Sequence, residues 1–246
     1  MSELHISISA QPIFNLGPYE VTNTMLVSLA VSLVLVLLAL NFLRLLKKNP
    51  QTRFVVVIQT LIESLYDYVL SIAPHHARKF FALTASIFLF VLLGSWAGLL
   101  PGAETIGLNR VYGGQVEFVP FLRGATADLN MTLGLAIFVM VSIQLYGYKQ
   151  LGLKYFKKFF NLTNPMNMFV GFLELISEFA KVISFAFRLF GNIFAGEVLL
   201  AVIAFLIPVV ASLPFIGLEL FVGFIQALVF ASLALVFANL AVTSHH

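Results

Sequence analysis

The chain has 246 residues, of which 60% are hydrophobic and 10% are charged, with a mean hydropathy of +1.00 and a formal net charge of +3. This composition is typical of a multi-pass membrane protein and excludes an ordinary soluble domain. The lack of cysteine excludes disulfides, iron–sulfur clusters and thiol catalysis, and the basic residues form no stripe that would bind nucleic acid.

The first half of the chain predicts three helices that cross a membrane and one helix that lies on its surface. The surface helix carries Gln59, Glu63 and Asp67 at positions i, i+4 and i+8, so its polar side chains share one face. Either Thr126 or Asp128 can cap the third crossing helix. In chain order we expect an outer N-terminal segment (1–23), a crossing helix (24–46), the surface helix (54–73), a second crossing helix (80–100), a polar, glycine-rich outer loop (101–127) and a third crossing helix (129–148).

The second half predicts a long helical hairpin behind a basic, aromatic connector (149–165), which reads as a surface helix. The helix over 166–207 would be about 63 Å long, although a hydrocarbon core is only about 30 Å thick, so it must tilt, bend or run along the interface. Pro208 and Pro214 bracket a turn, and 215–242 form the last helix. We therefore expect a single all-α membrane domain with about five membrane helices, one interfacial helix and a tilted antiparallel hairpin.

The basic residues predict the orientation of the chain. Ten of the 14 Lys and Arg residues fall in three patches, at 44–53, 78–79 and 149–158, which share one side if the surface helix does not cross. The positive-inside rule makes that side cytoplasmic. The N-terminus and the 101–127 loop are then outside, and the C-terminus is inside.

The long helix carries an ordered stripe of polar side chains around an arginine. At 100° per residue, one line of the helix holds Ser177, Lys181, Ser184, Arg188 and Asn192. A guanidinium keeps its proton in proteins, so this charge cannot be neutralised to ease its burial. The small residues Gly191, Ala195 and Gly196 lie close to the same side and would let a partner helix approach.

An antiparallel hairpin centred near Pro208 sets these groups in layers. Residues whose numbers add to about 415 then lie at equal depth, which pairs Arg188 with Gln226 and Glu197 with Glu219. The two layers are about 13 Å apart along the helix, with the carboxyl layer nearer the outside. On the cytoplasmic side of Arg188 lie Glu174 and Glu178.

Acid, arginine and acid therefore follow one another along the membrane normal. Intramembrane ionisable groups are costly and usually mark an ion path, and carboxyls can take up and release protons. A permanent cation between two acidic half-paths makes a poor channel. It suits a device in which a second protein carries the proton past the arginine.

Each of these residues also has a structural interpretation. Arg188 could be a snorkelling cation, Glu197 and Glu219 a hydrogen-bonded pair, Gln226 a packing amide, and Glu174 and Glu178 solvated end charges. Asp128 suits a helix cap as well as a channel acid, and Lys181 suits an interfacial charge. Neither His75 with His76 nor His245 with His246 favours a metal site. Rival functions are a stand-alone secondary transporter, which usually shows an internal repeat, and an intramembrane enzyme, for which no catalytic motif is present.

Five stretches carry a resemblance to a known family. They are "GLLPG" (98–102), "TADLNMTLGLA" (126–136), "FLELIS" (172–177), "FRLFGNIFAGE" (187–197) and "FIQALVFASLA" (224–234). Together they resemble subunit a of the F-type ATP synthase in its bacterial form. The resemblance implies that the chain is the stator of a rotary membrane motor and that this subunit has no catalytic centre of its own.

The resemblance implies a role for each of these polar residues. Arg188 would face the ring of c subunits and separate two aqueous half-channels, with Asn192 and Gln226 as its polar neighbours. The outer half-channel would use Glu197, Glu219 and Asp128. The inner half-channel would use Glu174 and Ser184, and we add Glu178 because it lies on the same cytoplasmic side of Arg188. The expected partners are the c-ring, the b-subunit stalk, the other synthase subunits and membrane lipid, with no cofactor, in a bacterial plasma membrane. Whether the ion is H⁺ or Na⁺ stays open, because its binding site belongs to the rotor.

Overall fold

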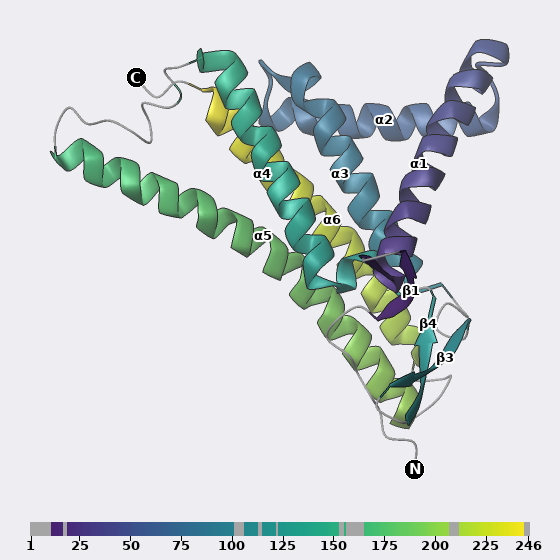
Figure 1. Ribbon diagram of the computed structural model, residues 1–246. Coiled ribbons are helices and arrows are strands. Elements are labelled where there is room, and N and C mark those ends of the chain that lie inside the picture. The colour runs from purple at the N-terminus through teal and green to yellow at the C-terminus, as the bar shows by residue number, and fades with distance from the viewer. Residues whose placement is uncertain are drawn as a thin grey trace.

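The computed structural model describes residues 11–16, 19–100, 106–112, 115–121, 123–152, 155, 165–206 and 212–243. The prediction of an all-α membrane protein is confirmed, because six helices in these residues are long and apolar enough to cross a membrane. Figure 1 shows them as a bundle from which one long helix diverges. The helices are α1 (Asn23–Lys48), α2 (Arg53–Ile72), α3 (Ala77–Ala97), α4 (Leu129–Leu151), α5 (Pro165–Leu206) and α6 (Ser212–Val242).

Two helices end at residues whose chemistry suits a terminus. The α4 helix begins after Asp128, whose side chain accepts a hydrogen bond from the backbone N–H of Asn130. It ends at Gly152, which has a φ of 59°, a conformation that favours glycine because it has no Cβ. The α1 helix is capped by Thr22 and closes with Lys47 and Lys48, whose charges suit a helix C-terminus.

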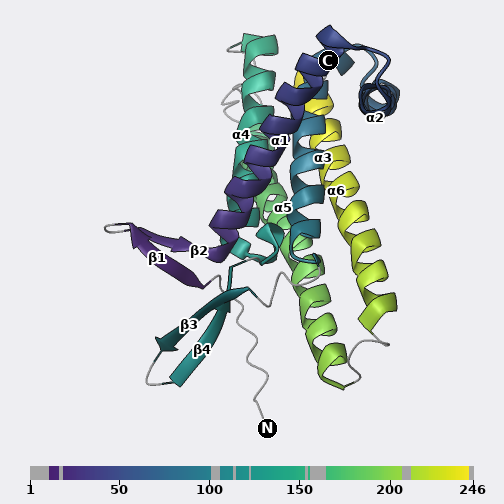
Figure 2. The same ribbon diagram turned by 90° about the vertical axis from the view of Figure 1, so that its right-hand side faces the viewer.

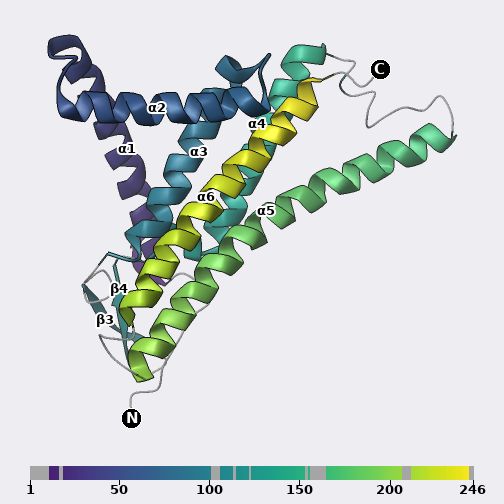
Figure 3. The same ribbon diagram turned by 180° about the vertical axis from the view of Figure 1, so that it is seen from behind.

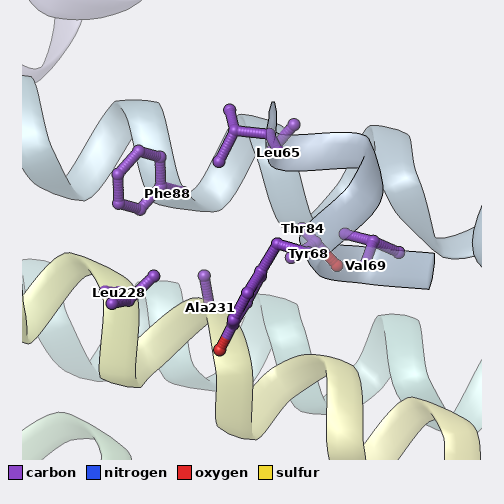
Figure 4. Close-up of a pocket in the computed structure, with 8 residues that line it drawn as sticks. Leu65, Tyr68, Val69, Thr84, Phe88, Leu228 and Ala231 are labelled. Atoms are coloured by element: carbon purple, nitrogen blue, oxygen red, sulfur yellow. The ribbon is translucent and has the colours of Figure 1, made fainter. Parts of the chain in front are cut away.

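The α2 helix, which the sequence predicts to lie on the membrane surface, lies across the bundle. Figure 2 views it end-on while the other helices run lengthwise. Its inner side buries Val55 and Val69, whereas Glu63 and Asp67 are exposed. Figure 4 shows Tyr68 reaching from α2 to α6, where its hydroxyl lies 2.6 Å from the Ser232 hydroxyl. The amphipathic pattern predicted from the sequence therefore corresponds to a helix that is held against α3 and α6 along one side.

Two β-hairpins lie at the end of the bundle opposite α2 (Figure 1). Strand β1 (Pro12–Leu16) pairs with β2 (Tyr19–Thr22), and β3 (Gly107–Tyr112) with β4 (Gln115–Pro120), both antiparallel. The expectation that 101–127 is simply a loop was wrong, because it holds the second hairpin and a short 3₁₀ helix, η2 (Ala125–Ala127). The sequence did carry the signal: β-branched and aromatic residues flank two adjacent glycines, a strong hairpin pattern.

The helices α5 and α6 form the predicted hairpin, and α5 has 42 residues. Figures 1 and 3 show α5 inclined to the bundle, against α6 at the hairpin end and far from it at the other. The last helix begins at Ser212 rather than 215, so Pro214 lies in its first turn and not in the connecting turn. Proline is tolerated there because the first-turn N–H groups have no helical partner. Pro208 lies outside the described residues, as do 153–154 and 156–164 of the predicted surface helix in 149–165, of which 149–151 continue α4.

The core lies where α3, α4, α5 and α6 meet. On α6 it is lined by small residues at intervals of three and four, which lets the neighbouring helices come close. Phe185 of α5 is 3% exposed and packs edge-on against Phe230 of α6, with ring centroids 4.8 Å apart. The alanines of this seam are Ala227, Ala231, Ala234, Ala238 and Ala241. This packing fixes which side of α5 is turned away from the bundle.

Candidate proton path

Arg188 lies on the side of α5 that is turned away from the core. Its neighbours Phe185, Ala186 and Leu189 are buried, whereas Arg188 itself is exposed. Within the described part of the chain, its one hydrogen bond runs from Nη2 to the Ser184 hydroxyl one turn earlier, at 3.3 Å. The arginine is therefore a charge held on an open helix face.

Small side chains surround Arg188 on that open face. Asn192, Gly191 and Ala195 are exposed beside Arg188, and a Cβ built on Gly191 would meet nothing within 4 Å. Small side chains let a second helix lie close to the arginine. The structure thus brings Ser184, Arg188, Asn192, Gly191 and Ala195 together on one face, as the helical spacing predicted.

Gly196 does not belong to this face, although the sequence placed it there. It is buried against α6, and a Cβ at this position would lie 1.9 Å from Glu219 Oε2. The error arose because the helical angle alone did not show where α6 crosses α5. Residues 196 and 219 nevertheless meet at the depth that the hairpin register predicted.

Glu219 is a buried carboxyl at the α5–α6 contact. Its exposed fraction is 6%, and its Oε1 is buried without a hydrogen-bond partner in the described residues. A buried polar atom of this kind is rare in folded proteins and often marks a functional group. The missing side chain of Gly196 makes the space in which this carboxyl lies.

Glu197 pairs with an arginine of the segment that the sequence predicted to be a loop. Its Oε2 lies 3.3 Å from Nε of Arg123, and both side chains are partly buried. The loop reaches α5 because it crosses α3 at a close approach between Gly98 and Gly124. The expected layer with two carboxyls therefore has a separate environment for each carboxyl. A lone basic residue in a polar loop gave no signal of this contact.

Asp128 acts as the helix cap that the sequence allowed. It is 5% exposed, caps α4 through Oδ1, and accepts a hydrogen bond from the Thr24 hydroxyl at 3.0 Å through Oδ2. Nearby, the hydroxyls of Ser95 and Thr126 lie 3.0 Å apart. Buried polar groups thus continue from Glu197 along η2 toward α1.

On the opposite side of Arg188, polar side chains line a cavity of about 230 Å³ between α4, α5 and α6. Glu178 Oε1 lies 2.8 Å from Nζ of Lys181, and Gln144 Nε2 donates to Glu178 Oε2 at 2.9 Å. Glu174 lines the same cavity. Lys181, which the sequence assigned to the interface, thus lies beside Glu178, with its Nζ 5.0 Å from the centre of the Phe237 ring.

The hairpin register sets Arg188 and Gln226 at equal depth, but no hydrogen bond joins them in the described residues. Gln226 is half-buried on α6, while Arg188 points away from the bundle. Glu178 and Glu197 lie about 15 Å and about 13 Å from Arg188 along α5, on opposite sides. The cation therefore stands between an inner polar cavity and an outer group of acids. In the described residues, no cluster of three or more His, Cys, Asp or Glu could hold a metal ion.

One comparison with known proteins bears on this arrangement. A family model described as the ATP synthase A chain matches residues 24–239. The match begins at the second residue of α1 and ends three residues before the end of α6. It therefore covers all six helices except for the first residue of α1 and the last three of α6.

Proposed function

This chain belongs to the ATP synthase A chain family, and on that premise we propose that its protons follow two half-paths separated by Arg188. The chain is a multi-pass membrane protein and the proton-translocating stator subunit of Fo, the non-catalytic sector of the synthase. The inner half-path would run through Glu174, Glu178 and Ser184. The outer half-path would use Glu219, Glu197 and Asp128.

The observation that carries this proposal is the position of Arg188 on an exposed face lined with small residues. A guanidinium cannot pass a proton on, so a proton has to cross this level on another molecule. We propose that the carrier is a carboxyl of the c-ring. As that carboxyl nears Arg188 the ion pair favours its charged form, and its proton leaves to one half-path. After the ring has turned, the carboxylate takes up a proton from the other half-path.

The first test asks whether the open face of α5 meets the rotor. The natural chain has no cysteine, so Ala195→Cys introduces a single thiol on that face. In the whole synthase, oxidation is expected to join it by a disulfide to a cysteine placed on the outward helix of subunit c. The measurement is an a–c dimer on a non-reducing gel.

Ala186→Cys is the matched control for this experiment, because Ala186 is 0% exposed and faces the core. It is expected to give no a–c dimer. Cross-linking from Ala186 with none from Ala195 would contradict a rotor contact on the face of Arg188.

We further propose that the chain lies in a bacterial plasma membrane with the N-terminus outside and the C-terminus inside, and with the b-subunit stalk as a second partner. Asn49 is exposed between α1 and α2, and Leu108 is 47% exposed on β3. A membrane-impermeant maleimide is expected to label Asn49→Cys in inverted vesicles and Leu108→Cys in right-side-out vesicles. The opposite labelling pattern would reverse the two half-paths.

A further inference from the structure

A chain of hydrogen bonds joins residues that line the cavity between α4, α5 and α6. The proposed proton path does not by itself require this chain. Tyr155, in the connector after α4, donates to Gln144 Oε1. Gln144 in turn donates to Glu178 at 2.9 Å, and Lys181 contacts the other oxygen of the same carboxylate at 2.8 Å. The chain thus joins the connector, α4 and α5 at the carboxylate of Glu178.

Two glycines, one in α4 and one directly after it, allow Tyr155 to pack where it does. Gly152 ends the helix with a positive φ and redirects the backbone. Gly147 leaves the space that the ring fills, because a Cβ there would lie 2.5 Å from the Tyr155 ring. As a result Tyr155 is only 5% exposed, although it lies in a connector. Gln144 is three residues before Gly147, so both lie on the same face of α4.

The direction of the hydrogen bonds follows from the chemistry of Tyr155. Burial is the main reason that the pKa of Tyr155 is raised to about 12, and the negative charges of Glu178 and Glu174 contribute less. The phenol therefore keeps its proton and donates to the amide oxygen of Gln144. This leaves the amide nitrogen of Gln144 facing Glu178, as an acceptor-only carboxylate requires.

Glu178 thus accepts a hydrogen bond from Gln144 on one oxygen and contacts Lys181 with the other. From α5 it faces Lys181 and Glu174, and from α4 and the connector it faces Gln144 and Tyr155. From α6 the cavity receives only apolar side chains, those of Phe237, Leu240 and Ala241. Of these two groups, Gln144 is held by Tyr155, whereas Lys181 is a flexible side chain three residues further along the same helix as Glu178.

We propose that Tyr155 and Gln144 are positioning residues of the inner half-path, which hold Glu178 as the carboxylate that passes protons to the cytoplasmic side. This inference rests on the proposed function. Neither residue carries the proton itself: Tyr155 orients Gln144, and Gln144 orients Glu178. The connector is thereby coupled to the proton exit.

The test replaces Tyr155 with phenylalanine in the whole synthase, reconstituted in proteoliposomes. The ring can stay on Gly147, so only the hydroxyl and its hydrogen bond are lost. ATP synthesis is driven by a fixed potassium diffusion potential. The pH on the cytoplasmic side of the enzyme (the inner pH) and the pH on the opposite side (the outer pH) are varied separately. A carboxylate with a weakened donor binds its proton more tightly, so the inner-pH profile is expected to move about 0.5 unit toward alkaline pH. The outer-pH profile is expected to stay unchanged.

Tyr146→Phe is the matched control. Tyr146 lies on α4, just before the connector that holds Tyr155, and packs against Phe80, and its hydroxyl has no hydrogen bond in the described residues. Because all variants share the same catalytic sector, the ratio of each profile to the unmodified enzyme removes the pH dependence of catalysis. An inner-pH profile that matches the Tyr146→Phe profile would overturn the inference.

Gln144→Met gives a second measurement that does not depend on Tyr155→Phe assembling. It is expected to move the inner-pH profile in the same direction, and the double variant is expected to move it no further, because both changes break one chain. Additive shifts would contradict a single chain. If Arg188→Ala abolishes coupling while these profiles do not move, only this inference fails; if Arg188→Ala leaves coupling intact, the proposed function fails.

Discussion

Replacing Arg188 with alanine is expected to abolish ATP-driven proton pumping, with a loss of at least about 100-fold, because the divider between the half-paths disappears. The guanidinium is exposed on an open face and is held only by Ser184 within the described residues. Its removal should therefore leave the packing of α5 against α6 intact. A neutral side chain can neither favour the charged form of a rotor carboxyl nor keep the two paths apart.

The measurement is the quenching of a pH-sensitive dye in inverted vesicles that carry the whole synthase. ATP hydrolysis in detergent is expected to stay near normal, which would show that the complex has assembled. Arg53→Ala serves as the control, because Arg53 is an exposed arginine at the start of α2, far from the open face of α5. Intact pumping by Arg188→Ala would rule out an arginine divider.

Arg188→Lys is a more demanding version of this experiment. Lysine keeps a positive charge but presents a compact ammonium instead of a planar fork of five donors. We expect partial or no recovery of pumping. Recovery to the unmodified level would mean that charge alone accounts for the divider.

The second large effect is expected from Gly196→Ala, which adds one methyl group at the buried α5–α6 contact. The new Cβ would lie 1.9 Å from Oε2 and 2.1 Å from Cδ of Glu219, far inside van der Waals contact. Either Glu219 must turn away or the helices must separate, and overpacking of this kind costs about 1–3 kcal/mol. Since Glu219 belongs to the proposed outer half-path, proton pumping is expected to fall about tenfold or more.

Gly134→Ala is the matched control, because a Cβ on Gly134 of α4 would meet nothing within 4 Å. It is expected to pump normally. A double variant, Gly196→Ala with Glu219→Asp, shortens the carboxyl side chain by one methylene and is expected to recover part of the activity. If Gly196→Ala pumped as well as Gly134→Ala, the space at Gly196 would be irrelevant to the path.

Much of the helical hairpin could be predicted because it depends on periodicity. The stripe through Ser184, Arg188 and Asn192 follows from 100° per residue, and the structure exposes all three on one face. The depth register follows from the rise per residue, and Gly196 meets Glu219 where that register pairs them. These are properties of one helix or of one hairpin, so they need no knowledge of the other helices.

Contacts between distant segments could not be predicted in the same way. Arg123 reaches Glu197 across 74 residues of sequence, and Tyr155 reaches Glu178 through Gln144. Neither contact has a spacing rule, because each depends on where a connecting segment folds back onto the bundle. Only the glycines gave a local sign, by allowing close approach at Gly124 and Gly147.

The sequence by itself determined the membrane class, the helices, the order of acid, arginine and acid along α5, and the family resemblance. All of these follow from hydropathy, helical periodicity and short sequence motifs. The tertiary structure alone decided that Gly196 faces α6, that Glu197 pairs with Arg123, and that Tyr155 donates to Gln144 beside Glu178. The physical reason is that a helix specifies angles and rises within itself, whereas the contacts of a side chain depend on which other segment occupies the space beside it.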